Sequence, residues 1–417
     1  MKQFANTVAL SVIIIALASY TAITCRDQAQ NEKVAQQVAQ FPVGKSFLEI
    51  PFQLERDRAI ILLTVNNSSP LKFLVDTGSK IPNLRGAAPA ESLGLKIIGD
   101  AIVGGAGSGA ETIAKTAGDV TFNISGATLK VAKMLVPPQP ASTLAPLSSF
   151  GIIGRPLFDN FVVEFDWAKQ VIRLYDPAKY IYSGKGTALP LIFDADGYPY
   201  TTAAITIPDT KPIPVKLFID TGANLALGLD MGSHPDIKLP ERSISTIVGV
   251  GAQGTVSGHL GRIKSLQIGG YTFKNVFTNY AAESNPFVGE AGTQGLIGNE
   301  VLRRFRVIFD YSRKQMILEP NWFFNQPFDG YMSGLAYART YPGLMELKVN
   351  NTFEGSAAKD AGLLVGDEII KINNRPVSEF TDDDLYRMFR KKGARLRLEI
   401  RRNDKQFEKK IKLRRFI

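Results

Sequence analysis

The feature that most constrains the fold of this chain is an internal repeat. Three short segments occur twice, in the same order, and each second copy lies 144 residues after the first. They are KFLVDTGS at 72–79 and KLFIDTGA at 216–223, GIIG at 151–154 and GLIG at 295–298, and FD at 165–166 and 309–310. One Asp-Thr-Gly tripeptide arises easily by chance, but three landmarks at one constant offset do not. The chain therefore contains two copies of one unit of roughly 140 residues.

The pattern inside the repeated unit is typical of β structure. From residue 47 to 320, short β-branched runs such as ILLTV at 61–65 alternate with Gly, Pro, Asn and Asp. After residue 321 Lys and Arg become denser, and a helix is predicted over 381–392, with a capping box at Thr381 and Asp384. A chain of 417 residues is expected to form two or three domains. The expected segments are an export segment (1–25), a tether (26–42), a first lobe (43–185), a second lobe (186–322) and a small α+β domain (323–417).

The N-terminus has the pattern of a targeting segment. Lys2 precedes an apolar run over 8–18 that is short for a membrane span. Cys25, the single cysteine of the chain, follows and resembles the lipid-acceptor cysteine of bacterial lipoproteins. An ordinary cleaved signal with an incidental cysteine and an uncleaved anchor are the alternatives. We expect an exported protein, in the periplasm or anchored to a bacterial membrane by a lipid.

Charge and motif patterns argue against several other functions. The formal net charge is +10, but Lys and Arg are spread along the chain without an aromatic-basic array, so no nucleic-acid partner is expected. The chain contains no zinc-ligand spacing, and neither a metal nor an organic cofactor is expected. Residues 249–254 spell Gly-x-Gly-x-x-Gly, but a β-like run follows them where a dinucleotide-binding motif needs a helix.

Each repeated Asp-Thr-Gly motif ends an apolar strand, which would place a carboxylate on a tight loop held by a rigid element. Two such units related by a pseudo-two-fold axis would bring Asp76 and Asp220 face to face, with each threonine bonding to the opposite loop. Two carboxylates in one site cannot easily both ionise, so the pair holds a single proton. One acid can then activate a water molecule as a base while the other donates a proton.

These paired motifs resemble those of the aspartic protease superfamily, and the segment 295–311 (GLIGNEVLRRFRVIFDY) is similar to bacterial retropepsin-like aspartyl proteases. The resemblance covers about residues 45–320 and implies a bilobal β fold. It also implies that Asp76 and Asp220 are the catalytic pair and that Ser79 bonds the outer oxygen of Asp76. The residues expected to support the dyad are Thr77, Gly78, Ser79, Thr221 and Gly222.

Two features depart from the pepsin-like pattern. Ala223 stands where the first copy has Ser79 and has no hydroxyl for Asp220, so we expect Asp220 to hold the shared proton. The segment 101–117 has no flap tyrosine. Glycine-rich segments in the two copies resemble the flaps of retroviral-type proteases, with surface hairpins of no catalytic role as the alternative. The candidate flap residues are Gly104, Gly105, Gly249 and Gly251.

The C-terminal segment resembles a PDZ domain. Residues 334–337 (GLAY) are similar to the Gly-Leu-Gly-Phe loop that binds a peptide carboxylate, and 354–373 match the bacterial PDZ pattern. The candidate peptide-binding residues are Gly334, Leu335, Ala336 and Tyr337, with Ala336 replacing a glycine of the loop.

The sequence as a whole predicts an exported aspartic endopeptidase with a polypeptide substrate and a peptide C-terminus as a possible PDZ ligand. The alternative is a scaffold that binds peptides with protease-like lobes and does not cleave them.

Overall fold

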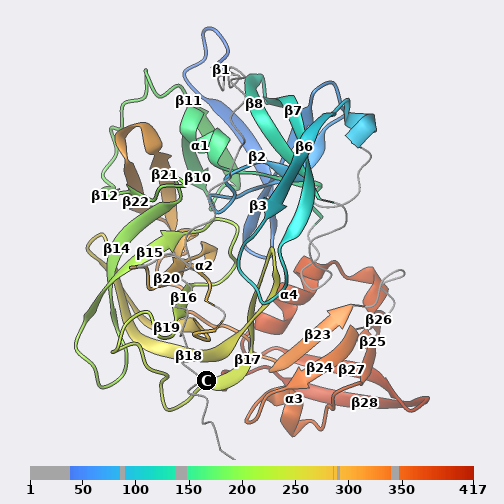
Figure 1. Cartoon of the computed structure of the whole chain (residues 1–417). Coiled ribbons are helices and arrows are strands. Elements are labelled where there is room, and N and C mark those ends of the chain that lie inside the picture. Colours follow the sequence, from blue (N-terminus) through green and yellow to red (C-terminus); the bar gives the residue numbers. More distant parts are fainter. Residues whose placement is uncertain (1–37, 85–89, 138–147, 285, 289–291, 340–346) are drawn as a thin grey trace, which may run out of the picture. The chain divides into compact units, whose positions relative to one another are not determined.

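The structure is a computed structural model that describes residues 38–84, 90–137, 148–284, 286–288, 292–339 and 347–417. The predicted export segment, Cys25 and most of the predicted tether lie outside these residues. Within the described ranges, no helix has the length and apolar character needed to span a membrane. The fold is mostly β, as the sequence predicted (Figure 1).

The first copy of the repeat is built from eleven described strands and one short α-helix, α1 (Arg155–Asn160). A 3-10 helix, η1 (Ala90–Leu93), precedes β6. The strands are β1 (Val38–Gln40), β2 (Leu48–Glu55), β3 (Arg58–Val65), β4 (Leu71–Val75), β5 (Asn83–Leu84), β6 (Lys96–Val103), β7 (Thr112–Ile124), β8 (Ala127–Val136), β9 (Gly151–Ile153), β10 (Val162–Asp166) and β11 (Val171–Tyr175).

The second copy follows the same plan, with helix α2 (Asn299–Leu302) at the place of α1 and a 3-10 helix, η2 (Tyr311–Arg313), after β21. Its strands are β12 (Thr187–Pro190), β13 (Ile192–Phe193), β14 (Pro199–Thr206), β15 (Ile213–Ile219), β16 (Leu227–Asp230), β17 (Ile244–Gly251), β18 (Gly254–Ile268), β19 (Tyr271–Ala281), β20 (Gly295–Ile297), β21 (Phe305–Asp310) and β22 (Gln315–Pro320).

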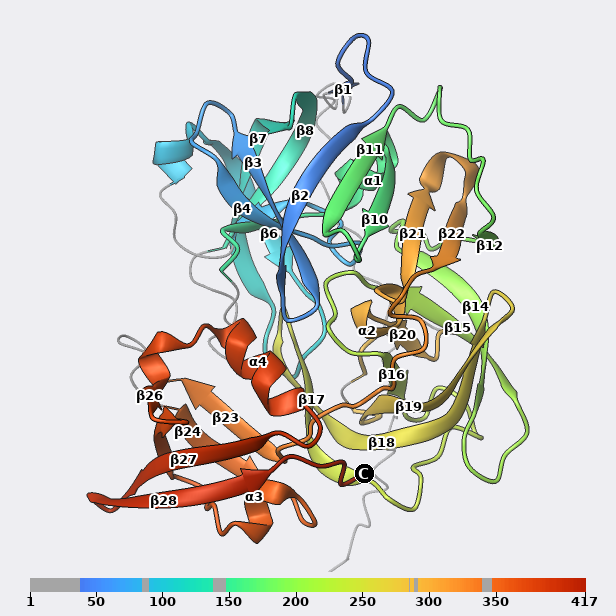
Figure 2. The ribbon, with the colours of Figure 1, turned by 180° about the vertical axis from the view of Figure 1, so that it is seen from behind.

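The pairing of β10 with β21 joins the two copies and shows their symmetry. The strands are antiparallel, and Glu164 lies opposite Ile308, its own counterpart 144 residues later. Val163 lies opposite Phe309 and Phe165 opposite Val307, so the register is symmetric about the Glu164–Ile308 pair. The order β2, β11, β10, β21, β22 therefore runs without a break from one copy into the other (Figure 2).

Aromatic side chains from both copies fill a shared core at this junction. Phe158 packs edge-to-face against Phe309, with ring centroids 5.4 Å apart, and Phe165 packs against Phe309 at 5.8 Å. All three rings are buried, and burying one such side chain stabilises a fold by about 1.5–3 kcal/mol. Because the two halves share this core, it fixes the position of the strands that carry the repeated aspartates.

The C-terminal domain is built on a six-stranded sheet in the order β23-β24-β25-β27-β28, in which β26 pairs with β25 off this path. It has a hydrophobic core of its own. The predicted helix is α4 (Asp382–Arg390), and it begins at the predicted capping box of Thr381 and Asp384. The remaining elements are β23 (Leu335–Arg339), β24 (Leu347–Thr352), α3 (Ala357–Asp360), β25 (Glu368–Ile372), β26 (Arg375–Pro376), η3 (Val377–Glu379), β27 (Arg395–Arg402) and β28 (Lys405–Lys412). The residue-level domain boundaries stay predictions.

Candidate active site

The structure holds Asp76 and Asp220 in equivalent places. Each follows a strand (β4 or β15) that pairs in parallel with the glycine-flanked strand of its own copy (β9 or β20). The backbone N–H of Asp76 donates to the Ile153 carbonyl at 3.0 Å, and that of Asp220 donates to the Ile297 carbonyl at 3.0 Å. The two carboxyl groups share a side-chain hydrogen bond. The repeat thus brings its two acids together where the copies meet.

Thr77 and Thr221 link the two aspartate loops by reciprocal hydrogen bonds. The Thr77 N–H donates to the Thr221 hydroxyl at 3.0 Å, and the Thr221 N–H donates to the Thr77 hydroxyl at 2.9 Å. The Thr77 hydroxyl donates to the Ile219 carbonyl at 2.6 Å, and the Thr221 hydroxyl donates to the Val75 carbonyl at 3.0 Å. Both threonines are buried, so the four bonds are shielded from water and rigidly connect the copies.

Gly78 and Gly222 allow the carboxylates to lie close to the opposite loop. Their N–H groups donate to Asp76 and Asp220, respectively, each at 2.7 Å. A Cβ at Gly222 would lie 2.4 Å from the Asp76 carboxyl carbon, and a Cβ at Gly78 would lie 3.2 Å from an Asp220 oxygen. Any larger residue at position 222 would therefore push the two acids apart.

The surroundings of Asp220 favour its protonated form. Burial raises the pKa of the Asp220 carboxyl well above its usual value, and the nearby charge of Asp76 raises this pKa further. The Gly222 N–H and the positive charge of Arg58 act in the opposite direction. One proton shared by the pair is the ionisation state that these effects favour. Arg58, the first residue of β3, was not singled out by the sequence analysis.

Asn299 is a second residue that the sequence analysis missed. It is the first residue of α2, directly after the repeated Gly-Leu-Ile-Gly run, and it is fully buried. Its side-chain amide donates to the Thr221 carbonyl at 2.6 Å, and its backbone N–H donates to the Ala223 carbonyl at 2.8 Å. Its place in the repeat could have pointed to it. Asn299 directly follows the second glycine-flanked run, at the position that Arg155 occupies in the first copy.

Ser79 has different partners from those that the resemblance implied. Its hydroxyl donates to the Ile81 carbonyl at 3.0 Å and accepts a bond from the Asn83 side chain at 3.1 Å, rather than bonding to Asp76. After the aspartate loop the chain turns, and this turn places the Ile81 carbonyl and the Asn83 side chain at the Ser79 hydroxyl. Ser79 therefore stabilises the loop itself, and the chemical difference between the two acids arises from other groups.

The two glycine-rich hairpins meet at their tips. The Gln253 N–H donates to the Ala106 carbonyl at 3.0 Å, and the Ser108 N–H donates to the Thr255 carbonyl at 3.1 Å. A Cβ at Gly251 would lie 2.2 Å from the Ala106 carbonyl oxygen, so glycine permits this close approach.

The candidate flap glycines do not all have the same neighbours. A Cβ at Gly105 would lie 2.9 Å from the Cβ of Ala252, and a Cβ at Gly104 would lie 3.8 Å from the Gln253 side chain. These two glycines therefore face the tip of the other hairpin. Gly249 lies against the Phe287 ring instead, where a Cβ would come within 2.8 Å of a ring carbon.

The candidate peptide-binding loop of the C-terminal domain has the backbone of a tight turn. Gly334 has φ +67°, and a Cβ there would lie 2.0 Å from the Ser356 Cβ, so a larger residue does not fit. Leu335 begins β23, an edge strand of the sheet that can accept a further strand. A β-bulge separates Ala336 from Tyr337, whose ring lies 5.4 Å from that of Phe389 on α4.

No cluster of three or more His, Cys, Asp or Glu side chains suited to a metal occurs among the described residues. The dyad itself consists of two carboxyl groups that face each other in a sheltered site. This arrangement, on two homologous β lobes, is that of an aspartic-protease-like fold.

Comparison with known families gives the same assignment. Residues 204–301 match the aspartyl protease family model, and residues 332–401 match the PDZ domain model. The chain thus carries an aspartyl protease region of retropepsin-like type and a C-terminal PDZ domain, as its motifs predicted. The aspartyl protease match includes Asp220 but not Asp76.

A search of solved structures found the crystal structure of an aspartic proteinase from Irpex lacteus. It is 14% identical, with a TM-score of 0.44, and the match covers 67% of this chain and 99% of that one. No curated protein matches the sequence.

Proposed function

We propose that this chain is an exported aspartic endopeptidase that hydrolyses peptide bonds with water activated by Asp76 and Asp220. The observation that carries the proposal is the hydrogen-bonded pair of carboxyl groups, one from each copy, with a raised pKa at Asp220. In the proposed reaction, ionised Asp76 takes a proton from water as the water oxygen attacks the peptide carbonyl carbon. Protonated Asp220 donates to the carbonyl oxygen, and the intermediate then releases the amine after a proton reaches its nitrogen.

The flap hairpins support a polypeptide substrate. Their tips are joined by backbone hydrogen bonds, which an extended peptide has to displace or slip beneath. The PDZ domain supports the same substrate class, because its edge strand β23 and the Gly334 turn are suited to an added strand with a free carboxylate.

The proposed export rests on the N-terminal sequence. A bacterial cell that expresses the full chain is expected to carry it in the envelope fraction, and Cys25→Ser is expected to release it from the membrane if Cys25 is lipidated. Recovery of the wild-type chain in the cytoplasm would contradict the proposal.

The competing function is a peptide-binding scaffold. Both acids and both linking threonines are present in hydrogen-bonded positions, which favours the enzyme. The test is cleavage of an unfolded protein at several pH values, with and without pepstatin, by the wild type, Asp76→Asn and Asp220→Asn. Each substitution is expected to lower kcat by at least about a thousandfold. Wild-type protein that binds the substrate and never cleaves it would establish the scaffold.

A further inference from the structure

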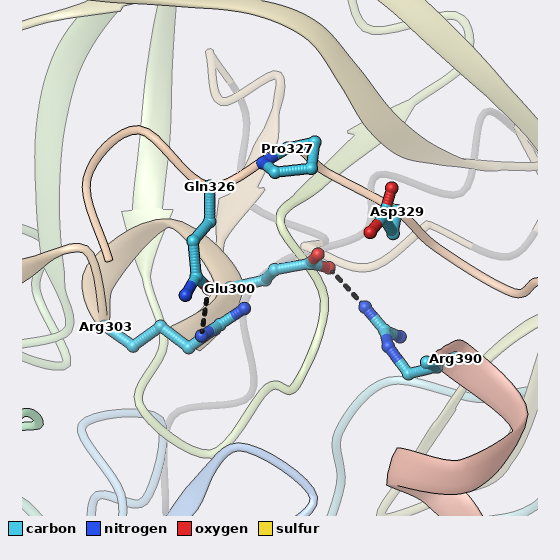
Figure 3. Close-up of a pocket in the computed structure, with 6 residues that line it drawn as sticks. All are labelled: Glu300, Arg303, Gln326, Pro327, Asp329 and Arg390. Atoms are coloured by element: carbon cyan, nitrogen blue, oxygen red, sulfur yellow. Dashed lines mark hydrogen bonds and ion pairs between the residues drawn. The ribbon is translucent and has the colours of Figure 1, made fainter. Parts of the chain in front are cut away.

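Helix α4 of the PDZ domain contacts both copies of the repeat. The Tyr386 hydroxyl donates to the Asp57 carboxylate, in the turn between β2 and β3, at 2.8 Å. The Arg56 N–H of the same turn donates to Asp383 at 2.8 Å. At the other end of α4, Arg390 forms an ion pair of 2.9 Å with Glu300 of α2 (Figure 3).

The Glu300–Arg390 pair lies where α2 meets the PDZ helix. Figure 3 shows the Glu300 carboxylate directed toward the Arg390 guanidinium. The two residues also line a cavity of about 360 Å³ together with Arg303, Gln326, Pro327 and Asp329. The Arg390 guanidinium also lies over the Tyr386 ring, with its carbon 4.8 Å from the ring centroid, so two partners hold this head group in place.

Glu300 is connected to the dyad through its own helix. Its N–H donates to the Leu225 carbonyl at 3.1 Å, and the preceding residue, Asn299, donates to the Thr221 carbonyl at 2.6 Å. Thr221 in turn bonds to Thr77 across the junction of the copies. A displacement of α2 would therefore reach the loop that carries Asp220.

The Glu300 carboxylate depends on a positive partner. The residue is 2% exposed, and burying a charged side chain costs free energy unless an opposite charge is paired with it. Arg262 and Arg304 contribute positive charge in the surroundings, and Arg304 bonds to the Glu300 backbone carbonyl. The direct ion pair of the carboxylate among the described residues is with Arg390.

From these contacts we infer that Arg390 is a positioning residue for the aspartate dyad, acting through Glu300 and Asn299. This inference rests on the proposed peptidase function and adds the PDZ domain to the support of the active site. Loss of Arg390 leaves a buried, unpaired carboxylate on α2 and loosens the bond between Asn299 and Thr221. The dyad then spends less time in the geometry that activates water, which lowers kcat more than it changes KM.

The test compares full-length Arg390→Met, Arg390→Gln and Arg390→Lys with the wild type. Lysine keeps the ion pair, glutamine keeps a hydrogen-bond donor, and methionine keeps only the apolar stem. A matched control is Arg397→Met, because Arg397 forms an exposed ion pair with Glu408 at 3.6 Å in the same domain. The readouts are kcat, KM and amide hydrogen exchange of a peptide covering residues 217–223.

We expect kcat of Arg390→Met to fall about tenfold or more with KM within about twofold, and Arg390→Lys to remain near the wild type. Exchange at residues 217–223 is expected to rise in the order Lys, Gln, Met. Unchanged kcat and exchange in Arg390→Met would overturn the inference. If that variant does not fold, wild-type kcat and exchange in Arg390→Gln overturn it equally. If the wild type cleaves nothing, the proposed function fails, and hydrogen exchange alone then decides whether Arg390 positions the dyad loop.

Discussion

The two copies of the repeat present their aspartates in the same way but support them differently. The strand pairing, the Asp-Thr-Gly loops and the reciprocal threonine bonds follow one plan. Behind the loops, Arg155 of the first copy is partly exposed and bonds to Asp159 at 3.0 Å, whereas its counterpart Asn299 is buried against Thr221. Symmetry is kept where the copies meet each other, and it is lost where each copy meets a different neighbour.

The largest expected effect tests the symmetric part of this comparison. Thr77→Val and Thr221→Val each remove two buried hydrogen bonds and leave their partners unsatisfied, so each is expected to lower the free energy of unfolding by about 2–4 kcal/mol. Chemical denaturation of both variants is the measurement. If the loss of unfolding free energy differs by more than about twofold between the two variants, the two copies do not contribute equally.

The second-largest expected effect tests the place where the two copies differ, which is Asn299 in the second copy and Arg155 in the first. Asn299→Ala removes the buried bond to the Thr221 carbonyl and is expected to cost about 1–3 kcal/mol of stability and to lower kcat. Arg155→Ala, its counterpart, removes a partly exposed ion pair with Asp159 and a hydrogen bond to the Asp196 carbonyl, and is expected to cost about 1 kcal/mol. Chemical denaturation and kcat are measured for both variants. A larger loss of stability and kcat in Arg155→Ala than in Asn299→Ala would contradict the comparison.

The two flaps offer a smaller contrast. A methyl group at Gly251 meets the Ala106 carbonyl oxygen at 2.2 Å, whereas one at Gly104 makes an ordinary contact at 3.8 Å. Gly251→Ala is therefore expected to raise KM for a peptide about three- to tenfold, and Gly104→Ala to leave it within about twofold. Equal KM values in the two variants would favour surface hairpins with no part in substrate binding.

The pH dependence of stability separates the two acids. Because the pKa of Asp220 is raised in the folded protein, the unfolded chain loses this proton first as pH rises, and the native state is progressively destabilised. Asp220→Asn removes this cost, so its Tm relative to the wild type is expected to increase as pH rises above about 4, up to the pH at which Asp220 ionises in the folded protein. Thermal unfolding of both proteins, measured from acid to neutral pH, is the check. A Tm difference that stays constant or shrinks would show that the Asp220 pKa is not raised.

The smallest effect concerns Ser79 and Ala223. Since the Ser79 hydroxyl bonds to Ile81 and Asn83, Ser79→Ala is expected to cost about 1 kcal/mol of stability and to leave the pH profile of activity in place. If Ser79→Ala shifts the pH profile of activity, the Ser79 hydroxyl does contribute to the chemical difference between the two acids. Ala223→Ser tests the same idea in the second copy, where a profile identical to that of the wild type is expected.

The sequence alone was enough to predict the two-copy β architecture, the pair of acids and the PDZ domain. These features depend on local patterns: apolar strands that end in Asp-Thr-Gly, glycine-flanked buried strands, and a capping box at Thr381 and Asp384. Such patterns can be recognised in the sequence because neighbouring residues determine them. The constant offset of 144 residues supplied the one long-range relation that the fold needs.

Tertiary structure decided which groups surround the acids. Arg58 lies 18 residues before Asp76 in the chain, yet its charge acts on Asp220. Asn299, at the start of α2, bonds to the Thr221 loop. Arg390 pairs with Glu300 from another domain. None of these pairs is near in sequence. The electrostatic environment of a buried carboxyl is set by what packs around it in three dimensions, and that packing is determined by the whole chain at once.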